Sequence, residues 1–170
     1  MIENMKKVIQ IQPELTVEER NLLSVAYKNN LGGRRSAYRV LESLEKKEEK
    51  KENSGHVAFI KEYKKKVEAE LISICNEIIE IVDKTLIPAS KDSESTVFYY
   101  KMKGDYYRYV SEASFGDAYT KAGDNAFQAY NAATEKAKTD LKTTHPIRLG
   151  LALNYSVFYY EVKKDPSKAC

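Results

Sequence analysis

The chain has 170 residues, of which 42% are hydrophobic and 31% charged, and its formal net charge is +3. This length fits one domain with a proper hydrophobic core, and a pI near 8.6 is too mild to indicate a nucleic-acid-binding protein. With only 4 prolines and 7 glycines, the composition favours long helices over a fold with many turns.

Targeting signals and covalent or metal cross-links are not apparent in the sequence. The N-terminal MIENMKKVIQIQ lacks the apolar region and cleavage site of a signal peptide, and no apolar run is long enough to cross a bilayer. Cys75 and Cys170 lie far apart and have no zinc-binding spacing with histidine. We therefore expect a protein of the cytoplasm or the nucleus that binds no membrane, metal or cofactor.

The N-terminal part of the chain predicts two helices. A short amphipathic stretch, about 2–11, precedes Pro13. Thr16 and Glu19 form a capping box, which predicts a helix from 17 to about 50.

Glycines and a polar turn divide this region. The pair at 32–33 is the weak point of the second helix, because each glycine costs about 1 kcal/mol of helix propensity. ENSG at 52–55 predicts a turn, and the helix after it is expected to end before Pro88. Its apolar stripe consists of Ile60, Tyr63, Val67, Leu71, Ile74, Ile78 and Ile81.

The C-terminal part predicts three more helices. A polar loop supplies N-caps for VFYYKMKGDYYRYVSEAS, which stops near Gly116, and a less apolar helix follows at about 118–141. The last long helix has Pro146 in its first turn and ends before DPSK. No strand pattern occurs in the sequence. We predict an all-α fold, an antiparallel bundle or cup of six to seven helices, as one domain over 1–170.

Positive charge concentrates between 20 and 41, where there are five cations and no acid. Lys28, Arg35 and Arg39 share one helical face, and Arg34 flanks it. Repulsion between Arg35 and Arg39 should cost roughly a few tenths of a kcal/mol, so acids from another helix or an anionic ligand should offset it. The alternative interpretation is a solvated basic face.

A second basic stretch, KMKGDYYRYV, places arginine beside tyrosine. Arg108 precedes Tyr109, and a guanidinium fork with a phenol suits phosphate oxygens. If this helix packs beside the first basic one, Lys28 and Arg35 would join them around one dianion. The alternative is that Arg108 pairs with Asp105 and that the tyrosines at 106, 107 and 109 belong to the core.

A third stretch, LGLALNYSVFYYE at 149–161, has an amide on an otherwise apolar helix. Leu153 and Val157 lie on one face, with Asn154 beside it. An amide offers the donor and the acceptor that an extended peptide backbone requires, but a buried amide bonded inside the core fits equally well. Gly150 has no side chain, so another helix could approach this position closely.

These stretches together resemble the 14-3-3 family. The carrying residues are EERNLLSVAYKN at 18–29, GGRRSAYRV at 32–40, YYKMKGDYYRY at 99–109 and THPIRLGLALNYSVFYYE at 144–161. The resemblance covers nearly the whole chain. It implies an all-helical cup whose groove binds phosphoserine or phosphothreonine peptides, and an adaptor rather than an enzyme.

Matching positions imply the site residues. The implied phosphate pocket consists of Lys28, Arg35, Arg108 and Tyr109. The other implied groove residues are Arg39 and Lys101 at the border of that pocket, Asn154 for the peptide backbone, Leu153 and Val157 in the apolar wall, and Glu161, which usually partners an aromatic residue. A phosphate carried by a partner protein would then explain cations that appear unpaired.

The sequence departs from the family pattern in three places. The match begins inside the family's second helix and stops where its eighth helix should begin, and Tyr38 stands where the family usually has tryptophan. We therefore expect a domain incomplete at both ends, a homo- or heterodimer weakened by the missing first helix, and lowered peptide affinity.

Other classes of function fit parts of the pattern. Basic residues interleaved with tyrosine would also suit single-stranded nucleic acid, and a helical scaffold can bind unmodified peptides. An enzyme is not expected, because His56 and His145 have no neighbouring pattern of nucleophile or metal ligand.

Overall fold

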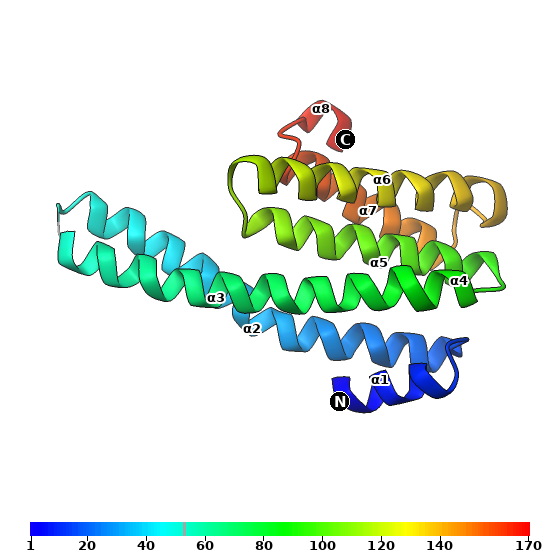
Figure 1. Ribbon diagram of the computed structural model, residues 1–170. Coiled ribbons are helices and arrows are strands. Elements are labelled where there is room, and N and C mark those ends of the chain that lie inside the picture. The colour runs from blue at the N-terminus through cyan, green and yellow to red at the C-terminus, as the bar shows by residue number, and fades with distance from the viewer. Residues whose placement is uncertain (53) are drawn as a thin grey trace.

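The computed structural model describes residues 1–52 and 54–170, which are helical along most of their length (Figure 1). No strand occurs in this described part of the chain, as the all-α prediction requires. The elements are α1 (Ile2–Ile11), α2 (Val17–Glu49), α3 (Ser54–Ile81), a π-helical turn η1 (Val82–Leu86), α4 (Ile87–Ala89), α5 (Ser93–Glu112), α6 (Gly116–Asp140), α7 (Pro146–Glu161) and α8 (Pro166–Ala169).

Successive long helices lie side by side in antiparallel order. Helices α2 and α3 form a long hairpin whose closed end projects beyond the remaining helices, while α1 packs against the other end of α2 (Figure 1). Helix α5 contacts α3 on one side and both α6 and α7 on the other. It is therefore the central helix of the molecule.

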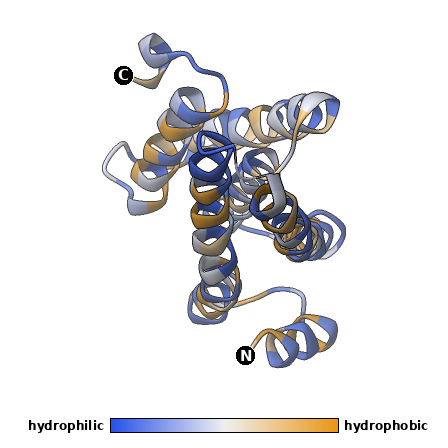
Figure 2. Cartoon of the chain, turned by 90° about the vertical axis from the view of Figure 1, so that its left-hand side faces the viewer, coloured by the Kyte–Doolittle hydropathy of each residue, from blue (hydrophilic) through white to orange (hydrophobic). Residues whose placement is uncertain are grey.

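Two hydrophobic cores meet at α5. The first joins α1, α2, α3 and α5 and includes the fully buried Tyr27 and Ile78. The second joins α5, α6 and α7 around Tyr130 and Phe158, which are equally buried. Figure 2 shows hydrophobic and hydrophilic residues alternating around the helices, so each helix presents a polar side as well as an apolar one.

Local signals explain how α2 begins and why it continues. Thr16 Oγ1 accepts a hydrogen bond from the Glu19 N–H at 3.3 Å, and Glu19 Oε2 accepts one from the Thr16 N–H at 2.9 Å. The predicted capping box is thus confirmed. The glycines at 32–33 do not interrupt the helix, because packing of α2 on α3 outweighs their low propensity.

Two predictions about the ends of α3 need correction. Pro88 does not end the helix: η1 widens the turn before it, and the Ile87 N–H bonds to the Val82 carbonyl oxygen five residues earlier. Of the predicted turn at 52–55, position 53 lies outside the described residues, and Ser54 already belongs to α3.

The buried stripe of α3 is also shorter than predicted. Tyr63, which was predicted to belong to the stripe, is 52% exposed. The buried side chains of α3 belong instead to Lys64, Val67, Leu71, Cys75, Ile78 and Ile79.

Close packing of α5 on α6 depends on Gly104. A Cβ atom at this position would lie 2.8 Å from Cδ1 of Tyr130, whose fully buried ring has no room to move. We expect Gly104→Ala to lower the free energy of unfolding by about 1–3 kcal/mol through overpacking. Gly32→Ala, where a Cβ meets nothing within 4 Å, should instead raise it by about 0.5–1 kcal/mol. Urea unfolding of both variants checks the contrast, and a loss of stability in both would contradict it.

Candidate functional site

The predicted phosphate-pocket residues lie along one side of α5, between the two cores. Arg108 and Tyr109 come from α5, and Arg35 reaches them from α2. The guanidinium carbon of Arg35 lies 3.9 Å from the centre of the Tyr109 ring, and that of Arg108 lies 4.7 Å from it. The structure therefore brings together residues 73 positions apart, as the sequence interpretation requires.

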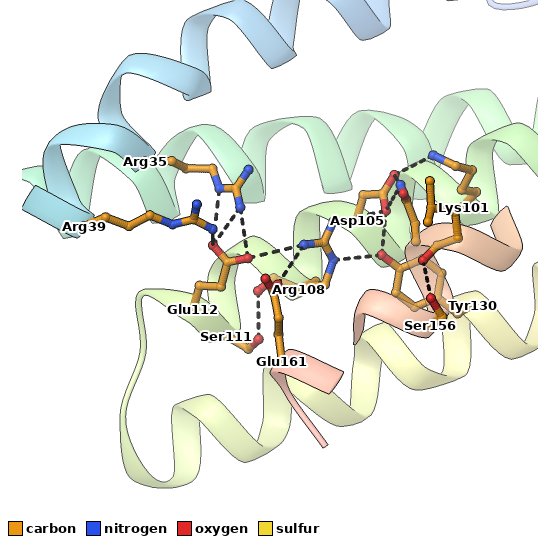
Figure 3. A network of polar contacts seen from close by, with 12 residues as sticks. Arg35, Arg39, Lys101, Asp105, Arg108, Ser111, Glu112, Tyr130, Ser156 and Glu161 are labelled. Carbon is orange, nitrogen blue, oxygen red and sulfur yellow. Dashed lines mark hydrogen bonds and ion pairs between the residues drawn. The ribbon is translucent and has the colours of Figure 1, made fainter. Parts of the chain in front are cut away.

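Glu112 of α5 binds the arginines of α2. Its Oε2 and Oε1 lie 2.9 and 3.0 Å from Nη2 of Arg35 (Figure 3). Nη2 of Arg39 lies 3.5 Å from the same Oε2. This carboxylate offsets the repulsion between Arg35 and Arg39. Of the two compensating groups predicted, an acid from another helix or an anionic ligand, the structure shows the acid.

Arg108 is 6% exposed, and every side of its guanidinium has a polar neighbour. Its Nη1 lies 3.3 Å from Glu112 Oε1 and 3.4 Å from Glu161 Oε2, and its Nε donates to the Tyr130 hydroxyl at 3.2 Å. The predicted alternative partner, Asp105, lies 3.7 Å from Nη2. Arg108 thus links α5 to both α6 and α7.

Asp105 accepts hydrogen bonds from three helices. It accepts from Lys101 Nζ at 2.8 Å, from the Tyr130 hydroxyl at 2.5 Å and from Asn154 Nδ2 at 2.8 and 2.9 Å (Figure 3). Burial raises the pKa of Tyr130, so this phenol stays protonated and donates a hydrogen bond to the carboxylate. Asp105 consequently connects α5 to α6 and α7 beside the site.

The amide of Asn154 was predicted with two roles left open. Its nitrogen is taken by Asp105, which matches the interpretation of an amide bonded inside the protein. No described residue donates a hydrogen bond to its oxygen, and Asn154 lines a cavity that it shares with Lys28 and Tyr109. The close helix approach predicted at Gly150 is not found, because a Cβ there would lie at an ordinary contact distance of 3.7 Å from Lys101 Cε. The close approach occurs at Gly104 instead.

Lys28 and Tyr109 differ from the arginines because their polar ends have no partner among the described residues. Lys28 is exposed, and both residues line a cavity of about 170 Å³ together with Lys101 and Asn154. Burial raises the pKa of Tyr109, so its hydroxyl stays protonated and can donate. These two groups are therefore available to a ligand without displacing anything.

A larger cavity, of about 450 Å³, opens beside Arg35. It is lined by Arg35, Tyr38, Arg39, Glu42, Leu71, Glu112, Ala113, Tyr119, Glu161 and Lys164. Arg35 lines this cavity and Tyr109, on which it stacks, lines the smaller one, so the two cavities meet at the Arg35–Tyr109 contact.

The cations of the groove are less free than the sequence suggested. The expectation of unpaired positive charge is wrong for Arg35, Arg39 and Arg108, each of which contacts a carboxylate. Five cations of the predicted site face three carboxylates, Asp105, Glu112 and Glu161, which leaves two excess positive charges. Sequence reasoning missed Glu112, although its i,i+4 spacing from Arg108 could have indicated a pair.

The predicted apolar wall lies on α7. Leu153 is 63% exposed and lies two turns before Glu161 at the helix end, and the half-buried Val157 lies one turn before it. Helix α7 begins at Pro146, and Nδ1 of His145 accepts the Ile147 N–H at 3.2 Å as its cap. This capping role accounts for His145 without any catalytic chemistry.

The described residues also bear on metal binding and on membrane insertion. No group of histidine, cysteine and carboxylate side chains suited to a metal ion occurs in the described residues. None of the described helices has both the length and the apolar character needed to span a bilayer.

Comparisons with known proteins agree on one family. A family model described as "14-3-3 protein" matches residues 1–170. The chain is 58% identical to "14-3-3 family protein artA" of Aspergillus flavus over 170 residues, which are 100% of this chain and 71% of that protein. It is 56% identical to "14-3-3 protein homolog" of Trichoderma harzianum and 55% identical to "Checkpoint signal transducer rad24" of Schizosaccharomyces pombe, again over the whole chain, which spans 65% and 63% of those proteins.

Proposed function

The chain belongs to the 14-3-3 family, and from this membership and the geometry of the groove we propose that it docks proteins carrying phosphoserine or phosphothreonine. Members of the family are adaptors in signalling rather than enzymes. The observation that carries the proposal is the excess of two positive charges in the predicted site, whose cations are Lys28, Arg35, Arg39, Lys101 and Arg108. A phosphorylated serine brings about −1.5 to −2 charges, which matches that excess.

The proposed phosphate site uses donors of two kinds. Nη1 of Arg35 is not among the atoms bound to Glu112, whereas a phosphate would have to compete with Glu112 and Glu161 for Nη1 of Arg108. Two parallel bonds from an arginine suit phosphate oxygens. The ammonium of Lys28 and the hydroxyl of Tyr109 supply donors with no prior partner. An unmodified serine has neither the charge nor the three acceptor oxygens, so the site would reject it.

Neighbouring residues would hold the rest of the peptide. The oxygen of Asn154 is placed to accept a backbone N–H, and Leu153 and Val157 offer an apolar wall on the same helix. Lys101 and Arg39 border the phosphate site, one in each cavity. Glu161 helps to position Arg108 through their 3.4 Å contact.

The first test is a fluorescence anisotropy titration with a labelled peptide of the form Arg-Ser-x-phosphoSer-x-Pro and its unphosphorylated twin. We expect the phosphorylated peptide to bind at least about 100-fold more tightly, because charge-assisted hydrogen bonds contribute about 1.5–3 kcal/mol each. Equal affinities would overturn the proposal and favour a scaffold for unmodified peptides.

A salt series separates the proposal from the nucleic-acid alternative. Binding of one phosphate group should give a shallow dependence of affinity on salt, whereas a single-stranded nucleic acid would release many counterions and give a steep one. The mixed charge of the groove, with three carboxylates among its cations, favours the first outcome.

Family membership also implies dimerisation, which we propose in homodimeric or heterodimeric form. Exposed apolar side chains on the α2–α3 hairpin, including Leu44 and Tyr63, are available for such a contact.

A further inference from the structure

We propose that Lys164 gives the groove a preference for an anionic side chain next to the phosphorylated residue. The inference rests on the proposed function, since it concerns the flanks of the same peptide. Lys164 lines the larger cavity together with Arg35 and Arg39, whereas Lys28 lines the smaller one. The ligand chemistry is a carboxylate of Asp or Glu, or a second phosphate.

The charge of Lys164 is uncompensated, unlike that of its neighbours. Lys163 lies 2.8 Å from Asp124, and Lys168 lies 3.6 Å from Asp165. Lys164 is exposed and has no acidic partner among the described residues. In a segment whose other lysines are paired, this cation is therefore the one available to a ligand.

The backbone at Lys164 is unusual for a lysine. Its φ is 54°, in the left-handed region that glycine and asparagine adopt more readily. The turn that follows is held by a hydrogen bond of 3.0 Å from the Asp165 N–H to the Tyr159 carbonyl oxygen. A long cation kept at such a position, at the rim of a cavity, points to a role for its side chain.

The other charges of the cavity leave room for an anion at this end. The arginines hold Glu112 and Glu161, and Glu42 is bound by Lys46 at 2.9 Å. Among the described residues Arg39 has one carboxylate contact, at 3.5 Å, and its side chain is 59% exposed. Besides Arg35, which the proposed phosphate would occupy, Arg39 and Lys164 are thus exposed cations of this cavity that a ligand can approach.

The test is a scan of phosphoserine peptides in which each flanking position in turn carries Ala, Asp, Lys or a second phosphoserine. Affinities are measured by anisotropy for the unmodified protein, for Lys164→Gln and for Lys163→Gln. The two variants lose the same charge from adjacent residues, but Lys163 does not line the cavity. The phosphoserine arm distinguishes a preference for carboxylate from a preference for a second phosphate.

We expect one position at which Asp improves affinity about threefold over Ala and Lys weakens it, the size typical of an exposed ion pair. Lys164→Gln should abolish that preference while keeping the requirement for the central phosphate, and Lys163→Gln should retain both. The same acidic preference in all three proteins, or none in the unmodified protein, would overturn the inference alone. Loss of the requirement for the central phosphate would instead overturn the proposed function and the inference with it.

Discussion

Arg35→Ala should weaken binding of the phosphoserine peptide by about 30-fold, with little change in binding of the unphosphorylated twin. The substitution removes a charged fork that contributes about 2 kcal/mol to a phosphate contact. It also removes the cation stacked 3.9 Å above the Tyr109 ring, which positions that phenol. Anisotropy titrations of the two peptides against the variant measure the effect.

Arg34→Ala is the matched control for that experiment. Arg34 is the adjacent residue of α2, but its Nε lies 2.9 Å from Glu70 Oε2 on α3 and its Nη1 donates to Asn30. It therefore faces away from the groove, and its loss should change peptide affinity by less than about twofold. Equal losses from the two variants would show that the effect is one of net charge, and would refute a localised phosphate site.

Asp105→Ala should destabilise the folded protein by about 3 kcal/mol and lower Tm by roughly 10 °C. The substitution leaves the buried phenol of Tyr130 without its acceptor and removes the carboxylate that lies 3.7 Å from the buried Arg108 guanidinium. It also frees Asn154 and Lys101, so α5 loses one of its polar links to α7. Differential scanning calorimetry measures the shift in Tm.

Two further variants show whether burial causes that effect. Asp105→Asn keeps an oxygen acceptor but no charge, and its Tm should fall between those of Asp105→Ala and the unmodified protein. Asp83→Ala removes an acid whose side chain is 53% exposed and which lies 2.6 Å from Lys103. That loss should cost less than about 1 kcal/mol. A comparable fall in Tm for Asp83→Ala would show that the buried network at Asp105 contributes no more to stability than an exposed ion pair.

The helices could be predicted from the sequence because their signals are local. The capping box of Thr16 and Glu19 and the placement of Pro146 each fix a helix start through residues three or fewer positions apart. The prediction at Pro88 was wrong for a related reason. A proline normally ends a helix, but here packing of η1 on α5 stabilises a widened turn that propensity alone does not predict.

The site was predictable in its cations but not in their pairing. Lys28, Arg35 and Arg39 were found from helical spacing, and Arg108 with Tyr109 from their chemistry. The family resemblance then assigned all of these but Arg39 to one phosphate pocket and added Glu161 to the groove. The contacts of Arg35 and Arg39 with Glu112 depend on how α2 packs against α5, across 77 residues of sequence in the case of Arg35. Tyr130 was missed altogether, because nothing near it in the sequence indicates that it lies beneath Asp105. Pairings of this kind follow from tertiary packing, which a single sequence does not encode in its local pattern.

The two cavities that meet at the Arg35–Tyr109 contact also restrict the shape of the proposed partner. A residue whose phosphate reaches Arg35 and Tyr109 would have its neighbours in two separate spaces, so the peptide would have to run extended on both sides. A serine inside a helix or a packed sheet cannot meet this requirement without unfolding locally. The groove therefore suits phosphorylation sites in disordered segments, whose ordering on docking lowers the affinity and makes the contact easy to reverse.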